Sequence, residues 1–430
     1  MKNKFIKSTL ILVIGGFFTK ALGMTIKIVL TRLIGTEGIG LYSMIMPTFL
    51  LLNSIAQLGL PTALNILIAT NKYNTKNLVF TAILISLSID ILIILFLIVS
   101  STFLSNNLLN DSRLSLGLLS IGFVLPFITI SNCLRSYFFA KQRMYPHVIT
   151  NIIEDLVKLI FIIIGIPFFL SKGIEYVIAF VILTNIFCEL SSIIIFIFLI
   201  PNFKCKGKEL KPNIKNIKEL FKIAIPTTGS RLIGSIGYFL EPIIITFVLL
   251  KIGYTNKFIV TEYGIINGYV MQLVLLPSFF TGAISQALIP IVSKNYVKGN
   301  FKYISKKIKQ AIFFSLLIGI PATIIFELFP DILLKLLFNT NKGIDYIKVI
   351  APICLLHYIQ SPISSSLQAM GSAKISMIGT LLGMIIRTIS LFIFSHLKIG
   401  LWSLVIATSI NIMFVTLFDL YNVRRILKKI

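Results

Sequence analysis

Long apolar blocks separated by short polar stretches constrain this 430-residue chain more than any other feature. Many of the blocks reach about 20 residues, the length that an α-helix needs to cross the hydrocarbon core of a bilayer. Charged residues make up only 13% of the chain, whereas about a quarter of the residues are charged in a typical soluble protein. The sequence therefore predicts an all-α, polytopic membrane protein.

The first apolar block follows three lysines, as the apolar core of a signal peptide does. It is too long for that role, it contains Lys20 and Lys27, and it has no small-residue cleavage site. We interpret it as a retained first span.

We expect about twelve transmembrane helices, with boundaries good to about three residues. They cover residues 8–30, 40–69, 78–102, 114–140, 147–170, 174–200, 218–250, 263–292, 308–329, 347–370, 375–396 and 400–423. The longest polar interruption, 201–217, is rich in lysine and leaves six spans on either side. We therefore expect an N-terminal six-helix lobe (1–200), a basic cytoplasmic linker (201–217) and a C-terminal six-helix lobe (218–430) around a central cavity.

The loops on the same side of the membrane as the N-terminus hold most of the 40 Lys and Arg residues. The positive-inside rule then places both termini in the cytoplasm of a multi-pass cell-membrane protein. This loop placement accounts for most of the net charge of +25, so we expect no nucleic-acid partner.

Signatures of enzymatic chemistry are absent from the sequence. There is no GxxxxGK[ST] phosphate-binding loop, and the three histidines (His147, His357 and His396) do not have metal-ligand spacing. The four cysteines have no spacing typical of a metal site or a disulfide framework. We expect a protein that is not an enzyme and that needs no cofactor and no metal.

Basic residues inside the apolar blocks are the most informative functional signal. Ionisable side chains within spans are costly, and they usually mark a transport pathway or a binding cavity. A phosphate or diphosphate would satisfy several Lys and Arg side chains together. We therefore predict a cationic cavity for an anionic substrate, lined by Lys20, Lys27, Arg135, Lys158, Arg231 and Arg387.

Other readings of these basic residues remain open. Lys20 and Lys27 could extend toward opposite membrane interfaces. Arg231 could form a structural ion pair with Glu241 or Glu154.

Three acidic residues are candidates for coupling or gating: Glu154, Glu241 and Asp90. Glu154 and Lys158 are four residues apart and share a helical face. Glu189 and Glu327 also lie within spans. The alternative for each acid is an interfacial or bundle-facing carboxylate paired with a nearby polar group.

A weak repeat relates the two halves of the chain. At one constant offset, Ala140 aligns with Ala369 and Lys158 aligns with Arg387. At a second offset, across the first span of each half, Lys20 aligns with Arg231. Each half has an even number of spans, so we expect the halves to run parallel about an axis along the membrane normal.

Three motifs carry a family resemblance. The segment RLIG-x-EG-x-GLY begins at Arg32 and is followed by LGLPTAL, and R-x-YF-x-A-x-x-x-M-x-P begins at Arg135 and is followed by Glu154 and Lys158. These segments resemble the stage V sporulation protein B family, within the multidrug/oligosaccharidyl-lipid/polysaccharide flippase superfamily. The segment IPTTGSRLIGSIGYFLEPIIITFVL, from Ile225, is similar to the start of the second lobe in that family.

The resemblance implies a lipid-linked saccharide flippase that works by alternating access. Its substrate would be an anionic polyprenyl-diphosphate-linked cell-wall precursor, namely peptidoglycan, for example of the spore cortex. The implied partners are the bilayer and envelope-synthesis enzymes. Sporulation and lipid II flippases usually have fourteen spans, so a count of twelve weakens a direct transfer of the lipid II substrate.

Three rival functions remain. They are a cation-coupled multidrug exporter, a polysaccharide repeat-unit flippase of the same superfamily, and a non-transporting scaffold in an envelope-synthesis complex.

Overall fold

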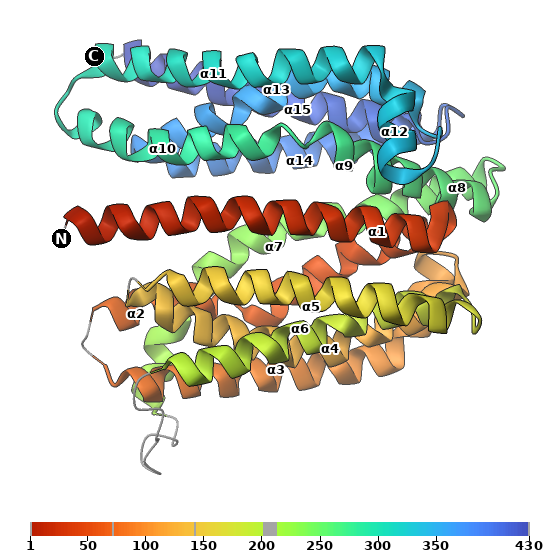
Figure 1. The fold of residues 1–430 in the computed structure, drawn as a ribbon, viewed down its shortest axis with the longest axis horizontal. Coiled ribbons are helices and arrows are strands. Elements are labelled where there is room, and N and C mark those ends of the chain that lie inside the picture. Colours follow the sequence, from red (N-terminus) through yellow and green to blue (C-terminus); the bar gives the residue numbers. More distant parts are fainter. Residues whose placement is uncertain (1, 71–72, 142, 201–212, 429–430) are drawn as a thin grey trace. The chain divides into compact units, whose positions relative to one another are not determined.

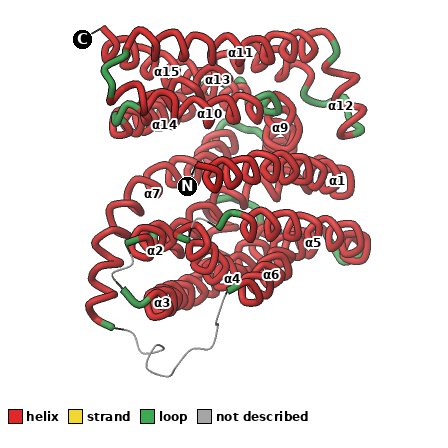
Figure 2. The backbone as a smooth tube through the Cα atoms, turned by 60° about the vertical axis from the view of Figure 1, so that its left-hand side comes forward, coloured by secondary structure: helices red, strands yellow, loops and turns green. Residues whose placement is uncertain are grey.

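The computed structural model describes residues 2–70, 73–141, 143–200 and 213–428 (Figure 1). Within these ranges every regular element is a helix, which confirms the predicted all-α fold (Figure 2). The chain divides into two compact units, Met1–Phe239 and Leu240–Ile430. We call them the N-terminal unit and the C-terminal unit and describe each by itself.

The N-terminal unit is a bundle in which α4 packs against α3 and α6, while α5 packs against α1 and α6. Two short elements, the π-helix η1 (Leu104–Leu108) and the 3₁₀-helix η2 (Ser112–Leu114), connect α3 to α4. The helices of this unit are α1 (Lys2–Gln57), α2 (Leu60–Ala69), α3 (Thr75–Phe103), α4 (Ser115–Ala140), α5 (Tyr145–Leu170), α6 (Ile174–Leu199) and the first part of α7 (Ile214–Lys251).

The first two predicted spans are joined in α1. The backbone at Gly35 has φ 68° and ψ −174°, which interrupts the helix without a loop. Glycine adopts this positive φ readily because it has no Cβ. The connection predicted between residues 30 and 40 is therefore a kink at Gly35.

The C-terminal unit is built around α13, which packs against α10, α11 and α15, while α14 packs along α15. The axis bends by 52° between Asn256–Val274 and Ser278–Val297, next to Pro277. After the end of α7 the elements are α8 (Asn256–Gly264), the π-helix η4 (Ile265–Val270), α9 (Met271–Val274), α10 (Ser278–Val297), α11 (Phe301–Leu328), α12 (Pro330–Phe338), α13 (Ile344–Ala369), α14 (Ala373–Ser395) and α15 (Trp402–Lys428).

Apolar side chains cover both the interior and much of the surface. Leu60 and Leu64 of α2 are fully buried against Leu78 of α3, whereas Val99 and Phe198 are each 84% exposed. Exposed apolar surface on this scale is expected where lipid replaces water as the solvent.

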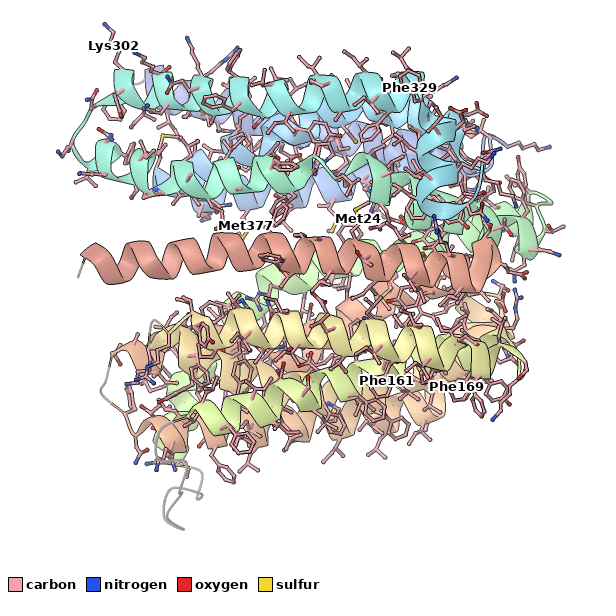
Figure 3. All side chains as sticks on the ribbon, viewed as in Figure 1. Met24, Phe161, Phe169, Lys302, Phe329 and Met377 are labelled. Atoms are coloured by element: carbon pink, nitrogen blue, oxygen red, sulfur yellow. The ribbon has the colours of Figure 1, made fainter. Side chains whose placement is uncertain are left out.

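Aromatic stacking ties α5 to α6. Phe161 stacks on Phe187 with ring centroids 4.5 Å apart, and Phe169 stacks on Phe180 at 4.7 Å. Figure 3 labels Phe161 and Phe169 on α5. These contacts hold α5 and α6 side by side.

Among the described residues, nine helices are long and apolar enough to cross a membrane, or ten if the bent pair at Pro277 is one span. The predicted twelve are not confirmed. Two differences account for the gap between ten and twelve. Residues Gly15–Ala69, which contain the two helices that meet at Gly35, count as one span, and α5 carries three charges (Glu154, Asp155 and Lys158) near its middle.

The predicted linker, 201–217, lies mostly outside the described residues, because the structure does not describe residues 201–212. The two compact units divide inside α7, between Phe239 and Leu240. The division into lobes of six spans at 201–217, and a cavity between them, stay predictions.

Candidate functional site

Three lysines of the N-terminal unit gather where α1 packs along α5. Lys20 and Lys27 are exposed on α1, and the ammonium groups of Lys20 and Lys158 both repel that of Lys27. No described atom lies within 4 Å of the position that a Cβ would take at Gly16 or Gly23 on the same helix. The helical face that carries Gly16, Lys20, Gly23 and Lys27 therefore borders open space.

Lys158 is held by a neutral group. Its Nζ donates a hydrogen bond to Asn185 Oδ1 of α6 at 3.0 Å, and Asn185 Nδ2 donates to the Ile182 carbonyl at 2.7 Å. An amide oxygen orients the ammonium group but does not neutralise its charge. Lys158 thus brings positive charge to the cluster of Lys20 and Lys27, and the carboxylates of Asp155 and Glu189 also interact with its charge.

Arg135 is committed to an ion pair. Its Nη2 lies 2.6 Å from Glu154 Oε1, and the two side chains are 19% and 18% exposed. The same Glu154 oxygen accepts a hydrogen bond from Ser192, and the Arg135 guanidinium lies 5.9 Å from the Phe196 ring centroid. The pair therefore joins α4, α5 and α6, and Glu154 bonds to Arg135 rather than to its helical neighbour Lys158.

Several polar groups around this pair lack a partner. Arg135 Nε, His147 Nδ1, Asn151 Oδ1 and Glu189 Oε2 are buried without a hydrogen bond to any described residue. Glu189 lies close enough to Glu154, Arg135 and Lys158 to interact with their charges. Buried groups of this kind are normally satisfied by ordered water or a bound ligand, so this cluster is polar and incompletely closed by protein atoms.

Arg231 is exposed and has no carboxylate partner among the described residues. Its Nη2 donates to Thr62 Oγ1 at 3.1 Å. Thr62 lies in the LGLPTAL segment, where Gly59 has φ 63° and a Cβ would overlap the Thr227 hydroxyl of α7. The close approach of α2 to α7 therefore positions Arg231, and its guanidinium is available to an anion.

Arg387 of the C-terminal unit pairs with Glu241. Arg387 Nη2 donates to Glu241 Oε2, and Tyr263 Oη donates to Glu241 Oε1 at 2.9 Å. The Glu241 side chain is 4% exposed and that of Arg387 is 13% exposed. Both Glu241 oxygens are engaged, and the ion pair considered for Arg231 with Glu241 is formed by Arg387 instead.

Asp90 is a buried acid in a neutral setting. Its Oδ2 accepts from Thr129 Oγ1 at 2.7 Å, and its Oδ1 has no hydrogen-bond partner among the described residues. The side chain lies between α3 and α4 and is 0% exposed. Asp90 is thus separate from the ion pair of Arg135 and Glu154.

Asp419 is a functional candidate that the sequence analysis missed. It is 0% exposed on α15, and it accepts a hydrogen bond from Ser364 of α13. The repeat held a signal for it, because the offset that aligns Lys158 with Arg387 places Glu189 one residue away from Asp419.

In the described part of the chain, no group of three or more His, Cys, Asp and Glu side chains could hold a metal ion.

Comparison with known proteins agrees with this architecture. Residues 5–296 match the family model described as polysaccharide biosynthesis protein, and residues 232–393 match the MatE model. The chain is 32% identical to stage V sporulation protein B of Bacillus subtilis (strain 168), over 99% of this chain and 85% of that protein. It is 19% identical to lipid II flippase MurJ of the same organism, over 90% of this chain and 77% of that protein.

Solved structures show the same fold. An inward-facing multidrug resistance MATE family transporter of the MOP superfamily superposes with a TM-score of 0.77, at 15% identity, over 96% of this chain and 95% of the other. An inward closed lipid II flippase MurJ has a TM-score of 0.70, at 17% identity, over 96% and 87% of the two chains.

These findings define a multi-pass membrane protein of the MOP flippase and transporter superfamily. The chain belongs to the polysaccharide biosynthesis protein family and is a homologue of stage V sporulation protein B. The family predicted from the three sequence motifs is confirmed.

Proposed function

We propose that the protein is a flippase that carries a polyprenyl-diphosphate-linked cell-wall precursor across the cytoplasmic membrane by alternating access. The observation that carries this proposal is the cluster of Lys20, Lys27 and Lys158, in which the ammonium groups of Lys20 and Lys158 both repel that of Lys27. Like charges close together within membrane-spanning helices are unfavourable unless an anion offsets them. A bound anionic headgroup removes that cost.

A diphosphate suits this cluster better than a single carboxylate does. It carries more than one negative charge and many acceptor oxygens, so it can accept hydrogen bonds from several ammonium groups at once. Arg231 adds an exposed guanidinium, which binds phosphate oxygens in a bidentate manner. The polyprenyl tail stays in the lipid while the headgroup crosses.

The six basic residues divide into two groups under this proposal. Lys20, Lys27, Lys158 and Arg231 bind the headgroup directly. Arg135 and Arg387 contact it only if their ion pairs with Glu154 and Glu241 open. Glu154 and Glu241 then act as gating residues, and Asp90 remains the coupling candidate that is free of an ion pair.

The energy for transport comes from gradients rather than from ATP. Moving net charge across the membrane is worth about 2.3 kcal/mol per charge per 100 mV.

The relatives named as a sporulation protein and a lipid II flippase support a peptidoglycan precursor as cargo. Envelope-synthesis enzymes that make or use this precursor are the partners that we expect.

Reconstitution in vesicles with a defined polyprenyl-diphosphate saccharide tests the function directly. Lys27→Glu should reduce translocation by about ten- to a hundredfold, because a charge-assisted contact is lost and a repulsive one is added. Lys302→Glu is the matched control, since Lys302 is an exposed lysine at the start of α11 (Figure 3). Full translocation by folded Lys27→Glu protein would sink the proposal.

A cation-coupled multidrug exporter is the second candidate, favoured by the match of residues 232–393 to the MatE model. It predicts drug resistance on overexpression that disappears in Asp90→Asn. Resistance that persists in this variant, or none at all, counts against it.

We also place both termini in the cytoplasm, on the basis of the loop charges. A reporter fused after residue 428 that is active only outside the cytoplasm should stay inactive. An active reporter would reverse this orientation.

A further inference from the structure

Asp419 is a buried acid of the C-terminal unit to which the proposed function gives no role. Its Oδ2 accepts from Ser364 of α13, whereas its Oδ1 has no hydrogen-bond partner among the described residues. The side chain is 0% exposed. On the α14 side lies Gly379, where an added Cβ would be 3.2 Å from Asp419 Oδ1 and closer still to the Phe418 ring. The α14 backbone therefore closes the site without offering a side chain to it.

The helices packed against α15 bring no charge to Asp419. On α13, Tyr358 donates to the Val274 carbonyl and His357 contacts Gln360, and both lie more than one helical turn from Ser364. On α14, Lys374 is exposed at the helix start and Arg387 is paired with Glu241.

Asp419 also has no charged partner on its own helix. Arg424 follows on α15 and is exposed. No ion pair joins Asp419 to any residue that the structure describes.

An ionised carboxylate in this site would have a single hydroxyl donor and no counter-ion. Burying a charge without a partner is costly, and such groups take up a proton instead. The neutral acid is therefore the stable form while α13, α14 and α15 are packed together. The anion needs water, which reaches Oδ1 only if these helices separate.

The N-terminal unit provides the contrast. Glu189 of α6, which the repeat offset places one residue away from Asp419, is also buried and lies near the like charge of Glu154, but Arg135 and Lys158 are close enough to offset part of this. Asp419 has no such cations. A buried acid thus has cations nearby in one unit and, among the described residues, none in the other.

We propose that Asp419 is a proton-binding site of the C-terminal unit. The carboxylate takes up one proton from water when the helices close over it, and it returns that proton to water when they open. Proton occupancy and the packing of α14 against α15 are thereby linked. The site does not depend on the cargo, and only its coupling to translocation rests on the proposed function.

Infrared spectroscopy of the purified full-length protein in lipid nanodiscs tests the site without any transport assay. A buried protonated carboxyl has a carbonyl band distinct from that of a carboxylate. We expect Asp419→Asn to lose one such band, and we expect the band in the unchanged protein to fall as the pH is raised. Asp331→Asn, which removes an exposed acid on α12, should leave the band intact.

A second variant covers the case in which Asp419→Asn does not fold. Ser364→Ala keeps the acid and removes its hydrogen-bond donor, so it should shift the same band without abolishing it. Carbodiimide, which modifies protonated carboxyls in apolar sites, should label the α15 peptide at neutral pH and not at high pH.

Three results would overturn the proposal. They are an Asp419→Asn spectrum identical to that of the unchanged protein, a band that persists at every pH, and a band that sodium ions remove at constant pH. In vesicles, Asp419→Asn should lose the pH dependence of translocation. Absence of translocation in the unchanged protein would count against the proposed function alone, because the spectroscopic result stands by itself.

Discussion

The two units each place a basic residue and an acid in contact within their bundles, but the surroundings of the two pairs differ. In the C-terminal unit, Arg387 and Tyr263 occupy both oxygens of Glu241, which is 4% exposed. In the N-terminal unit, Arg135 and Glu154 are 19% and 18% exposed and lie among buried polar atoms without partners. One pair is closed by protein atoms, and the other belongs to an open polar network.

This difference has consequences for function. A closed pair in a low-dielectric interior stabilises one arrangement of helices, because separating it leaves a charge uncompensated. An open network with Lys158, Asp155 and Glu189 nearby can exchange partners at lower cost. We therefore expect the Arg135–Glu154 pair to exchange partners more readily than the Arg387–Glu241 pair.

The largest effect should come from breaking the closed pair. Arg387→Met leaves Glu241 buried without a cation, and we expect the free energy of unfolding to fall by about 3–5 kcal/mol. Chemical unfolding in mixed detergent micelles measures this. The double variant Arg387→Met with Glu241→Met should recover most of the loss, and a double variant as unstable as the single one would contradict a closed pair.

Breaking the open network should cost less. Glu154→Gln removes the partner of Arg135 but leaves Glu189 close to the guanidinium, so we expect a loss of about 1–3 kcal/mol in the same measurement. Ser192→Ala removes only the hydroxyl donor and serves as the control. A loss equal to that of Arg387→Met would erase the distinction between the units.

The smallest effect concerns an exposed pair at the start of η2 in the N-terminal unit. Arg113 Nη1 lies 2.6 Å from Glu37 Oε1, with side chains 32% and 40% exposed, and Arg113 also pairs with the buried Asp111 at 2.7 Å. Glu37→Gln should therefore cost at most about 1 kcal/mol and less at high salt. Asp111→Asn is the comparison variant and should lower the free energy of unfolding more than Glu37→Gln does. A larger loss in Glu37→Gln would show that exposure does not predict the strength of these ion pairs.

Much of the fold follows from the sequence for a simple reason. A backbone in lipid must satisfy its own hydrogen bonds, so apolar blocks of this length become helices whatever their neighbours are. The connection between the first two predicted spans is an exception. The sequence predicted a loop between residues 30 and 40, whereas in the structure the two helices meet at a kink at Gly35. Hydropathy does not distinguish a kink from a loop, since both interrupt an apolar stretch with polar or small residues.

The candidate site was less accessible to sequence reasoning. The sequence predicted Lys20, Lys27 and Lys158 as lining residues of one cavity, and the structure brings the charges of Lys20 and Lys158 close to that of Lys27. Asp419 escaped attention because it lies near the end of the last span, where acids are usually solvated. Only the packing of α13 and α14 over it makes this carboxyl a buried one.

The sequence by itself determined that this chain is helical, that it lies in a membrane and which charges its spans carry. Those properties depend on local composition and on a helical period of 3.6 residues. The tertiary structure alone decided the ion-pair partners, since Arg387 bonds to Glu241 across 146 residues of sequence. Helical periodicity says which face a charge is on, but only packing says what lies opposite that face.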